Sequence, residues 1–133
     1  MVKKTIFFFL AAATLFSACK KNDTAVVKTT AQKVIAKWAV SSLVLVNYKS
    51  GVGTTYTTAT TAADYIDFRT DGNSYAFVQN IRDTAIYQVI NDQSIKLKTD
   101  TMQIKTLTNN SFILVAKQYY RTDSSVTTIS LKK

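Results

Sequence analysis

From Trp38 onward, apolar residues recur along the chain with a period of two rather than 3.6. Ile95 and Leu97, for example, alternate with Lys96 and Lys98. The residues that favour strands (Thr, Val, Ile, Tyr and Phe) dominate this part, and the chain contains no proline. This pattern predicts an all-β domain built from antiparallel strands, each with one buried face.

Turn residues divide this part of the chain into seven or eight short strands. Asn91–Asp92 and Asn109–Asn110 are typical turn pairs. Residues 51–63 are rich in Thr and fit either one more strand or a mobile loop. So many short strands with almost no helix predict a closed barrel or a small sandwich. Beside two hairpins, we expect strands over residues 37–48, 84–90, 111–120 and 125–131.

The first hairpin is predicted around Asp71–Gly72, a preferred two-residue turn because both positions can take positive φ. A turn centred there places Phe68 opposite Tyr75. It also places Ile66 opposite Phe77, so that all four apolar side chains share one face of the sheet.

The second hairpin joins the strand containing Leu97 to the strand containing Ile104. A turn at Asp100–Thr101, or a loop over residues 99–102, sets Leu97 opposite Ile104 in either case. The same register places Lys96 opposite Lys105, and like charges that face each other across two strands are unfavourable.

Lys96, Lys98 and Lys105 therefore form a candidate anion-facing basic patch. Headgroup phosphates of a membrane are one class of anion that relieves such a repulsion. A solvated outer face, with its charges screened by salt, explains the same residues without a ligand.

The interior of the predicted barrel is a candidate ligand pocket. A barrel of about eight strands is just wide enough to be filled by side chains or to hold one small ligand. The hydroxyl groups of Tyr75 and Tyr87 are the expected polar contacts if a ligand binds. The candidate ligand-lining residues are Phe68, Tyr75, Phe77, Tyr87, Leu97, Met102, Ile104, Phe112 and Leu114.

The first nineteen residues resemble the signal peptide of bacterial lipoproteins. Two lysines precede the apolar run of residues 6–16, which is too short to cross a bilayer, and small residues lead into Cys19, the one cysteine. The resemblance implies cleavage before Cys19 and acylation of this residue, including palmitate-type chains that anchor the protein in a membrane. An ordinary secretory signal cut after Ala18 is the alternative. We expect residues 1–18 to be the signal peptide, 19–35 a lipidated tether and 36–133 the barrel domain.

The rest of the chain resembles the small lipocalin-like domains of lipoproteins from Gram-negative bacteria. The resemblance implies a meandering barrel whose floor is closed by Trp38, with or without an open ligand cavity. It also implies the outer membrane as the location, on the periplasmic face by default, with surface exposure as the alternative. Ala36 departs from the pattern, since a glycine often precedes the tryptophan by two positions. The matching residues are Trp38, Phe68, Asp71, Gly72, Tyr87, Val89, Ile104, Leu107, Thr108 and Phe112.

The composition argues against catalysis. The chain has no His and no Glu, and its single Cys is assigned to lipidation, so the usual bases and metal ligands are missing. We expect no enzyme activity, no cofactor and no metal. Three arginines and the lack of a glycine-rich phosphate loop argue against nucleic acid as a partner. Two functions remain: a lipid-anchored module that binds a small apolar or amphipathic molecule, or a filled β-domain that interacts with another envelope protein.

Overall fold

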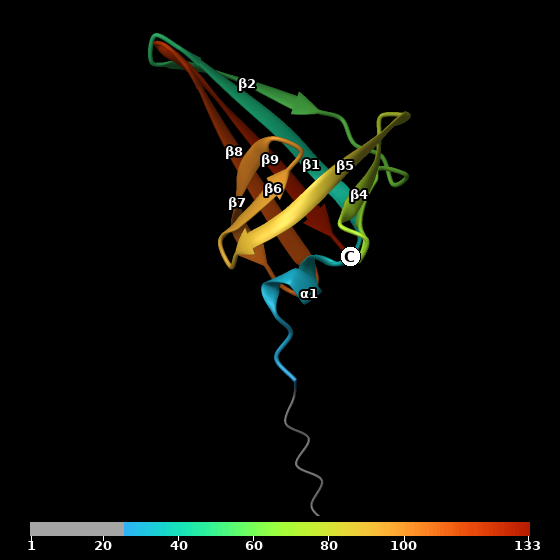
Figure 1. The fold of residues 1–133 in the computed structure, drawn as a ribbon. Helices are drawn as coiled ribbons and strands as arrows, with labels where there is room; N and C mark the ends of the chain where they lie inside the picture. Colours follow the sequence, from blue (N-terminus) through green and yellow to red (C-terminus); the bar gives the residue numbers. More distant parts are fainter. Residues whose placement is uncertain (1–25) are drawn as a thin grey trace, which may run out of the picture.

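The computed structural model describes residues 26–133, and the predictions for the signal peptide and for Cys19 lie outside the described residues. The predicted all-β fold is confirmed: nine antiparallel strands follow one short helix (Figure 1). The elements are α1 (Thr30–Val34), β1 (Ala36–Lys49), β2 (Val52–Thr58), β3 (Tyr65–Phe68), β4 (Asn73–Val78), β5 (Ile81–Asn91), β6 (Ser94–Leu97), β7 (Asp100–Leu107), β8 (Ser111–Tyr120) and β9 (Asp123–Lys132).

Eight of the strands form a closed, lipocalin-like barrel. From β3 to β9 each strand pairs with the next one in sequence, and β9 returns to pair with β1. The ninth strand, β2, pairs with β1 alone. The predicted barrel is therefore confirmed, and the Thr-rich segment 51–63 forms β2 followed by a loop.

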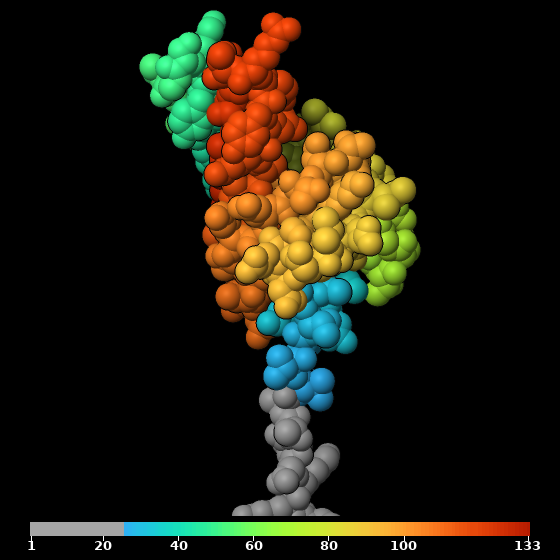
Figure 2. All heavy atoms as spheres, turned by 60° about the vertical axis from the view of Figure 1, so that its left-hand side comes forward, coloured from blue at the N-terminus to red at the C-terminus, as the bar shows by residue number. Residues whose placement is uncertain are grey.

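Strand β1 is long because it serves both the barrel and an extension of it. Its first part pairs with β3 over residues 36–39, and its later part pairs with β2 over residues 43–49. The ends of β1, β2, β8 and β9 consequently stand beyond the barrel as a four-stranded sheet, here called the projecting ribbon (Figures 1 and 2).

The predicted register of the β3–β4 hairpin is wrong by one residue. Phe68 lies opposite Ser74, not Tyr75, because the loop holds three residues. The Arg69 N–H donates to the Asn73 carbonyl at 3.0 Å, and Gly72 takes φ +80°. This is a type I turn followed by a glycine bulge rather than a two-residue turn. A slip of one residue moves every side chain of β4 to the other face.

The predicted register of the β6–β7 hairpin is also wrong, but with a milder consequence. Leu97 lies opposite Asp100 rather than Ile104, because the turn contains only Lys98 and Thr99. The shift covers an even number of residues, and so the faces are preserved. Ile95 still shares the inner face with its new partner, Met102.

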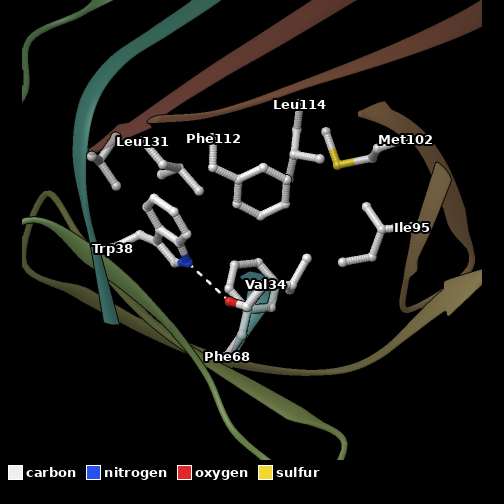
Figure 3. Packing of buried hydrophobic residues seen from close by; sticks show 9 residues of the cluster. Val34, Trp38, Phe68, Ile95, Met102, Phe112, Leu114 and Leu131 are labelled. Atoms are coloured by element: carbon white, nitrogen blue, oxygen red, sulfur yellow. Dashed lines mark hydrogen bonds between the residues drawn. The ribbon is translucent and has the colours of Figure 1, made fainter. Parts of the chain in front are cut away.

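One end of the barrel, here called the floor, is filled by large side chains. Trp38, Phe68 and Phe112 are buried, with ring centroids 5.4 Å apart for Trp38–Phe112 and 5.8 Å apart for Phe68–Phe112. Val34 of α1 inserts beneath them, and its carbonyl accepts the Trp38 indole N–H at 2.9 Å (Figure 3). Buried indole groups need such a partner.

Helix α1 belongs to the barrel rather than to a free tether. A capping box fixes its start: the Thr29 side chain accepts the Gln32 N–H, and the Gln32 side chain accepts the Thr29 N–H. Its Val34 is completely buried in the core. Residues 29–35, which were expected to belong to the tether, therefore pack against the barrel, and the described chain enters the barrel at the floor (Figure 1).

Candidate functional site

The end of the barrel opposite α1, here called the mouth, contains a cavity of about 290 Å³. Strands β3 to β9 all contribute to its walls. A volume of this size is at the lower limit of typical small-molecule pockets. The apolar part of the lining consists of Ile66, Ala76, Ala85, Leu97, Met102, Leu114, Ala116 and Ile129.

A second cavity, of about 310 Å³, lies beside the first one in the mouth. The two cavities share Ile66, Ala76, Asp83 and Ile129 as lining residues. The second cavity is completed mainly by aliphatic side chains of β1, β4 and β5. The two cavities therefore adjoin, and together they are called the two-lobed hollow of the mouth.

The mouth is hollow because small residues occupy inward positions there. The pairing of Ile66 with Ala76 and of Ser74 with Ala85 puts short side chains on the inner face of β4 and β5. Ala116 does the same on β8. The interior of an eight-stranded barrel is filled only when the inward side chains are large enough to meet across the axis, and these are not.

The wall of the mouth has an opening beside β5. Strand β5 pairs with β6 only from Tyr87 onward, so its earlier residues have no neighbour on that edge among the described strands. Lys98, in the β6–β7 turn, crosses this opening. Its Nζ donates to both carboxylate oxygens of Asp83, at 2.8 and 3.0 Å. This hydrogen bond lowers the pKa of Asp83, which is therefore ionised at neutral pH.

A buried carboxylate holds the loop at the rim of the mouth. Asp64 is 1% exposed and accepts the backbone N–H groups of Thr61 at 2.8 Å and Gln79 at 2.9 Å. These hydrogen bonds lower the pKa of Asp64, and the one from Thr61 has the largest effect. Gln79 and Asn80 both have positive φ, and Asp64 thereby fixes the β4–β5 turn to the loop before β3.

Seven of the nine residues predicted to line a ligand lie inside the barrel, at different depths. Leu97, Met102 and Leu114 line the mouth cavity. Phe68 and Phe112 are packed in the floor instead. Tyr87 and Ile104 are partly buried and pack against the floor cluster.

Tyr75 and Phe77 point away from the interior, as a consequence of the one-residue slip in β4. The Tyr75 hydroxyl donates to Asp71 at 3.1 Å, which raises the pKa of Tyr75, and the Arg69 guanidinium lies 4.3 Å from its ring. Phe77 instead packs beside Tyr65 on the outer face. Neither residue can line the cavity in this arrangement.

Tyr87 lies inside the barrel, but its hydroxyl already has a partner. It donates to the Arg69 carbonyl at 2.7 Å, and the ring makes an edge contact with Phe68. Burial raises the pKa of Tyr87. The predicted polar contacts for a ligand, Tyr75 and Tyr87, are therefore both used in the β3–β4 hairpin region.

The predicted juxtaposition of Lys96 with Lys105 is wrong. Lys96 lies opposite Thr101 on β7 and Gln88 on β5. Lys105 sits at a bulge in β7, whereas Lys98 is bonded to Asp83 at the mouth. The three lysines do not face one another across a strand pair, and the repulsion that motivated an anion site is absent from this part of the described chain.

Sequence reasoning missed the residues that leave the mouth open and those that make its rim polar. Ala76 and Ala116 were not selected because alanine carries no strong pattern of its own. Asp83 was not selected because it precedes the expected start of its strand. The correct β3–β4 register would have identified Ala76, and through it the cross-strand partner Asp83.

The projecting ribbon displays large side chains to solvent. Tyr119 is 77% exposed, and Val52, Tyr56 and Tyr120 are also exposed. The outer edge of β2 has no partner strand in the described structure. A groove of about 530 Å³, separate from the mouth cavities, lies on this ribbon between the ends of β1, β8 and β9.

A scan of protein-family models and a search of curated proteins found no match to this chain. Within residues 26–133, no helix is long and apolar enough to span a membrane. The same residues bring together no group of three side chains suited to hold a metal ion. The fold and the cavity therefore define the class: a small lipocalin-like barrel with a filled floor and a hollow mouth.

Proposed function

We propose that this protein is a lipid-anchored, non-catalytic binding module whose barrel mouth holds one small apolar or amphipathic molecule. The observation that carries the proposal is the two-lobed apolar hollow at the mouth. Its aliphatic walls offer contact to a hydrocarbon group, and its rim offers Asp83, Lys98 and Asp100 to a polar group. Pockets of this kind, mainly apolar with a few polar groups, are typical of small-molecule sites.

The anchoring half of the proposal depends on the sequence of the first nineteen residues. Acyl chains on Cys19 would hold the protein at the outer membrane, on the periplasmic face. The chain enters the barrel at the floor, next to α1, and the mouth lies at the other end (Figure 1). An anchored barrel would therefore present its mouth away from its point of attachment.

Ligand binding is tested by filling the mouth. Ala76→Phe introduces a large side chain into both lobes, because Ala76 lines each of them. Thr84→Phe is the matched control, since Thr84 is exposed on β5 and pairs with the outward Tyr75. A neutral, environment-sensitive apolar probe should bind the wild type and Thr84→Phe saturably and lose its binding to Ala76→Phe. Absence of saturable binding to the folded wild type, or equal binding to both variants, would overturn the proposal.

The projecting ribbon favours a second candidate function, interaction with another envelope protein. Its exposed tyrosines and the free edge of β2 are features that protein partners use. Tyr56→Ser combined with Tyr120→Ser should abolish co-purification of such a partner and leave probe binding in the mouth intact. Retention of the partner by this double variant would exclude the ribbon as its docking surface.

Attachment itself is tested by Cys19→Ser in the full chain. The proposal predicts that the wild type incorporates labelled palmitate and fractionates with the outer membrane, whereas Cys19→Ser does neither. Unlabelled wild-type protein recovered in a soluble fraction would support the ordinary secretory signal instead.

A further inference from the structure

Three charged side chains surround the mouth, and their arrangement bears on the headgroup of the ligand. The two side-chain hydrogen bonds that Lys98 donates both go to Asp83. Asp100 also lines the cavity, on the inner face opposite Leu97. Within the described residues, the Asp100 carboxylate makes neither a salt bridge nor a side-chain hydrogen bond. The rim therefore holds one neutralised ion pair and one uncommitted carboxylate.

We propose that the mouth selects amphipathic molecules with a positively charged headgroup, such as a primary amine, whose hydrocarbon tail enters the apolar hollow. This inference rests on the proposed ligand-binding function and adds the chemical class of the ligand. The headgroup binds Asp100 at the rim, and the tail contacts aliphatic residues such as Leu97 and Ile129.

A carboxylate headgroup fits the same rim poorly. It would bring a third negative charge close to Asp83 and Asp100. It could gain Lys98 only by displacing an existing ion pair, which leaves Asp83 without its partner. Like charges at contact distance repel one another even where water screens them, as it does at this exposed rim.

The overall charge of the chain favours anionic rather than cationic ligands, but it acts at longer range than the charges of the rim. The net charge is +9, which favours the approach of anions. Salt screens charges separated by more than about 8 Å at physiological ionic strength. The charges that line the cavity therefore decide which headgroup is retained.

Three probes with the same tail separate the headgroup from the pocket: n-decylamine, n-decanol and n-decanoate, each used below its micelle concentration at neutral pH. Each probe competes with the neutral fluorescent probe for the purified protein. We expect decylamine to bind several-fold more tightly than decanoate, with decanol between them, because the rim charges are exposed to water.

Single variants then assign the preference to the rim. Asp100→Asn should lower the affinity for decylamine several-fold, to about that of decanol, and leave decanol unchanged. Lys98→Met, which leaves two carboxylates, should strengthen decylamine binding. Asp83→Asn, which frees Lys98, should shift the preference toward decanoate. Asp92→Asn is the control, because it removes one carboxylate far from the mouth, where Asp92 accepts a hydrogen bond from Thr30 of α1.

The outcomes distinguish the two proposals. If none of the three probes binds, the ligand-binding function fails, and this inference fails with it. If all three bind with the same affinity, or if decanoate binds most tightly, the pocket stands and the cationic headgroup is wrong. If decylamine is preferred but Asp92→Asn weakens it as much as Asp100→Asn does, the preference comes from overall charge and the assigned site is wrong.

Discussion

The floor and the mouth are two ends of one barrel, built on the same strands, yet only the floor is filled. The floor residues Trp38, Phe68 and Phe112 are at most 1% exposed. The mouth positions on the same inner faces hold Ala76 and Ala116, which are only partly buried. The comparison shows that strand topology closes the barrel, whereas the size of inward side chains decides whether its interior is a core or a pocket.

The two ends also differ in how they are held together. At the floor, aromatic rings pack against one another and against Val34, and the one indole N–H has a buried acceptor. At the mouth, polar groups hold the rim: Asp64 accepts two backbone N–H groups, and Lys98 bonds to Asp83. The packed core at the floor therefore stabilises the fold, and the hydrogen bonds of the rim keep the mouth open.

Truncating a large side chain should give the largest difference between the two ends. Phe112→Ala removes the central ring of the floor and should lower the free energy of unfolding by about 3–5 kcal/mol. Leu97→Ala removes a partly buried side chain at the mouth and should cost less than about 2 kcal/mol, since its site is already hollow. Urea denaturation of both variants measures the difference. Equal losses would contradict a distinction between a filled and a hollow end.

Enlarging a side chain tests the same distinction in the opposite sense. Val34→Phe places a ring where the core is full and should destabilise the protein by about 1–3 kcal/mol through overpacking. Ala76→Phe places the same ring in the hollow and should not lower the unfolding midpoint. Comparable destabilisation by the two substitutions would show that the mouth is packed as tightly as the floor.

The pH dependence of stability should report on the rim. The pKa of Asp64 is lowered in the folded state, so this carboxylate stabilises the protein fully above the usual carboxyl pKa. That stabilisation is lost as the pH falls through the lowered pKa of the folded state. Urea midpoints measured from neutral to strongly acidic pH should fall less for Asp64→Asn than for the wild type, which starts from a higher value. Parallel curves would show that the ionised Asp64 carboxylate does not stabilise the folded protein.

The ion pair across the opening should have the smallest effect on stability. Lys98 and Asp83 are both more than half exposed, and exposed pairs contribute little because water and salt screen them. Lys98→Met should therefore leave the urea midpoint unchanged while it alters headgroup preference. A clear loss of stability would mean that the pair holds the barrel wall together, and not only that it affects headgroup preference.

Recurrence of apolar residues with a period of two was sufficient to predict the β class, and the resemblance to lipocalin-like domains favoured a barrel over a sandwich. The recurrence was not sufficient for β2, whose Thr side chains occur on both faces and show no alternation. The same limit applies to the site. Alanine at an inward position carries no hydrophobic pattern, although its small size creates the cavity.

The other wrong predictions result from errors in the register of the two hairpins. An Asp–Gly pair fits a two-residue turn and also a three-residue loop with a glycine bulge. Gly72 has a positive φ but Asp71 does not, and the Arg69 N–H donates to the Asn73 carbonyl, as the longer loop requires. The resulting slip of one residue turned Tyr75 and Phe77 outward. In the β6–β7 hairpin, the slip was even, so Leu97 and Met102 remained inside. Turn length, which depends on the backbone conformation of one or two residues, decided which site predictions survived.

The difference between the two ends is tested most directly by methyl-resolved NMR during titration with decanol. We expect saturable shifts of the methyl groups of Leu97, Leu114 and Ile129, which line the mouth. We expect no comparable shifts for Val34 and Leu131, which are buried in the floor. Shifts distributed equally over both ends, or no saturable shift at the mouth, would contradict a barrel that is filled at the floor and hollow at the mouth.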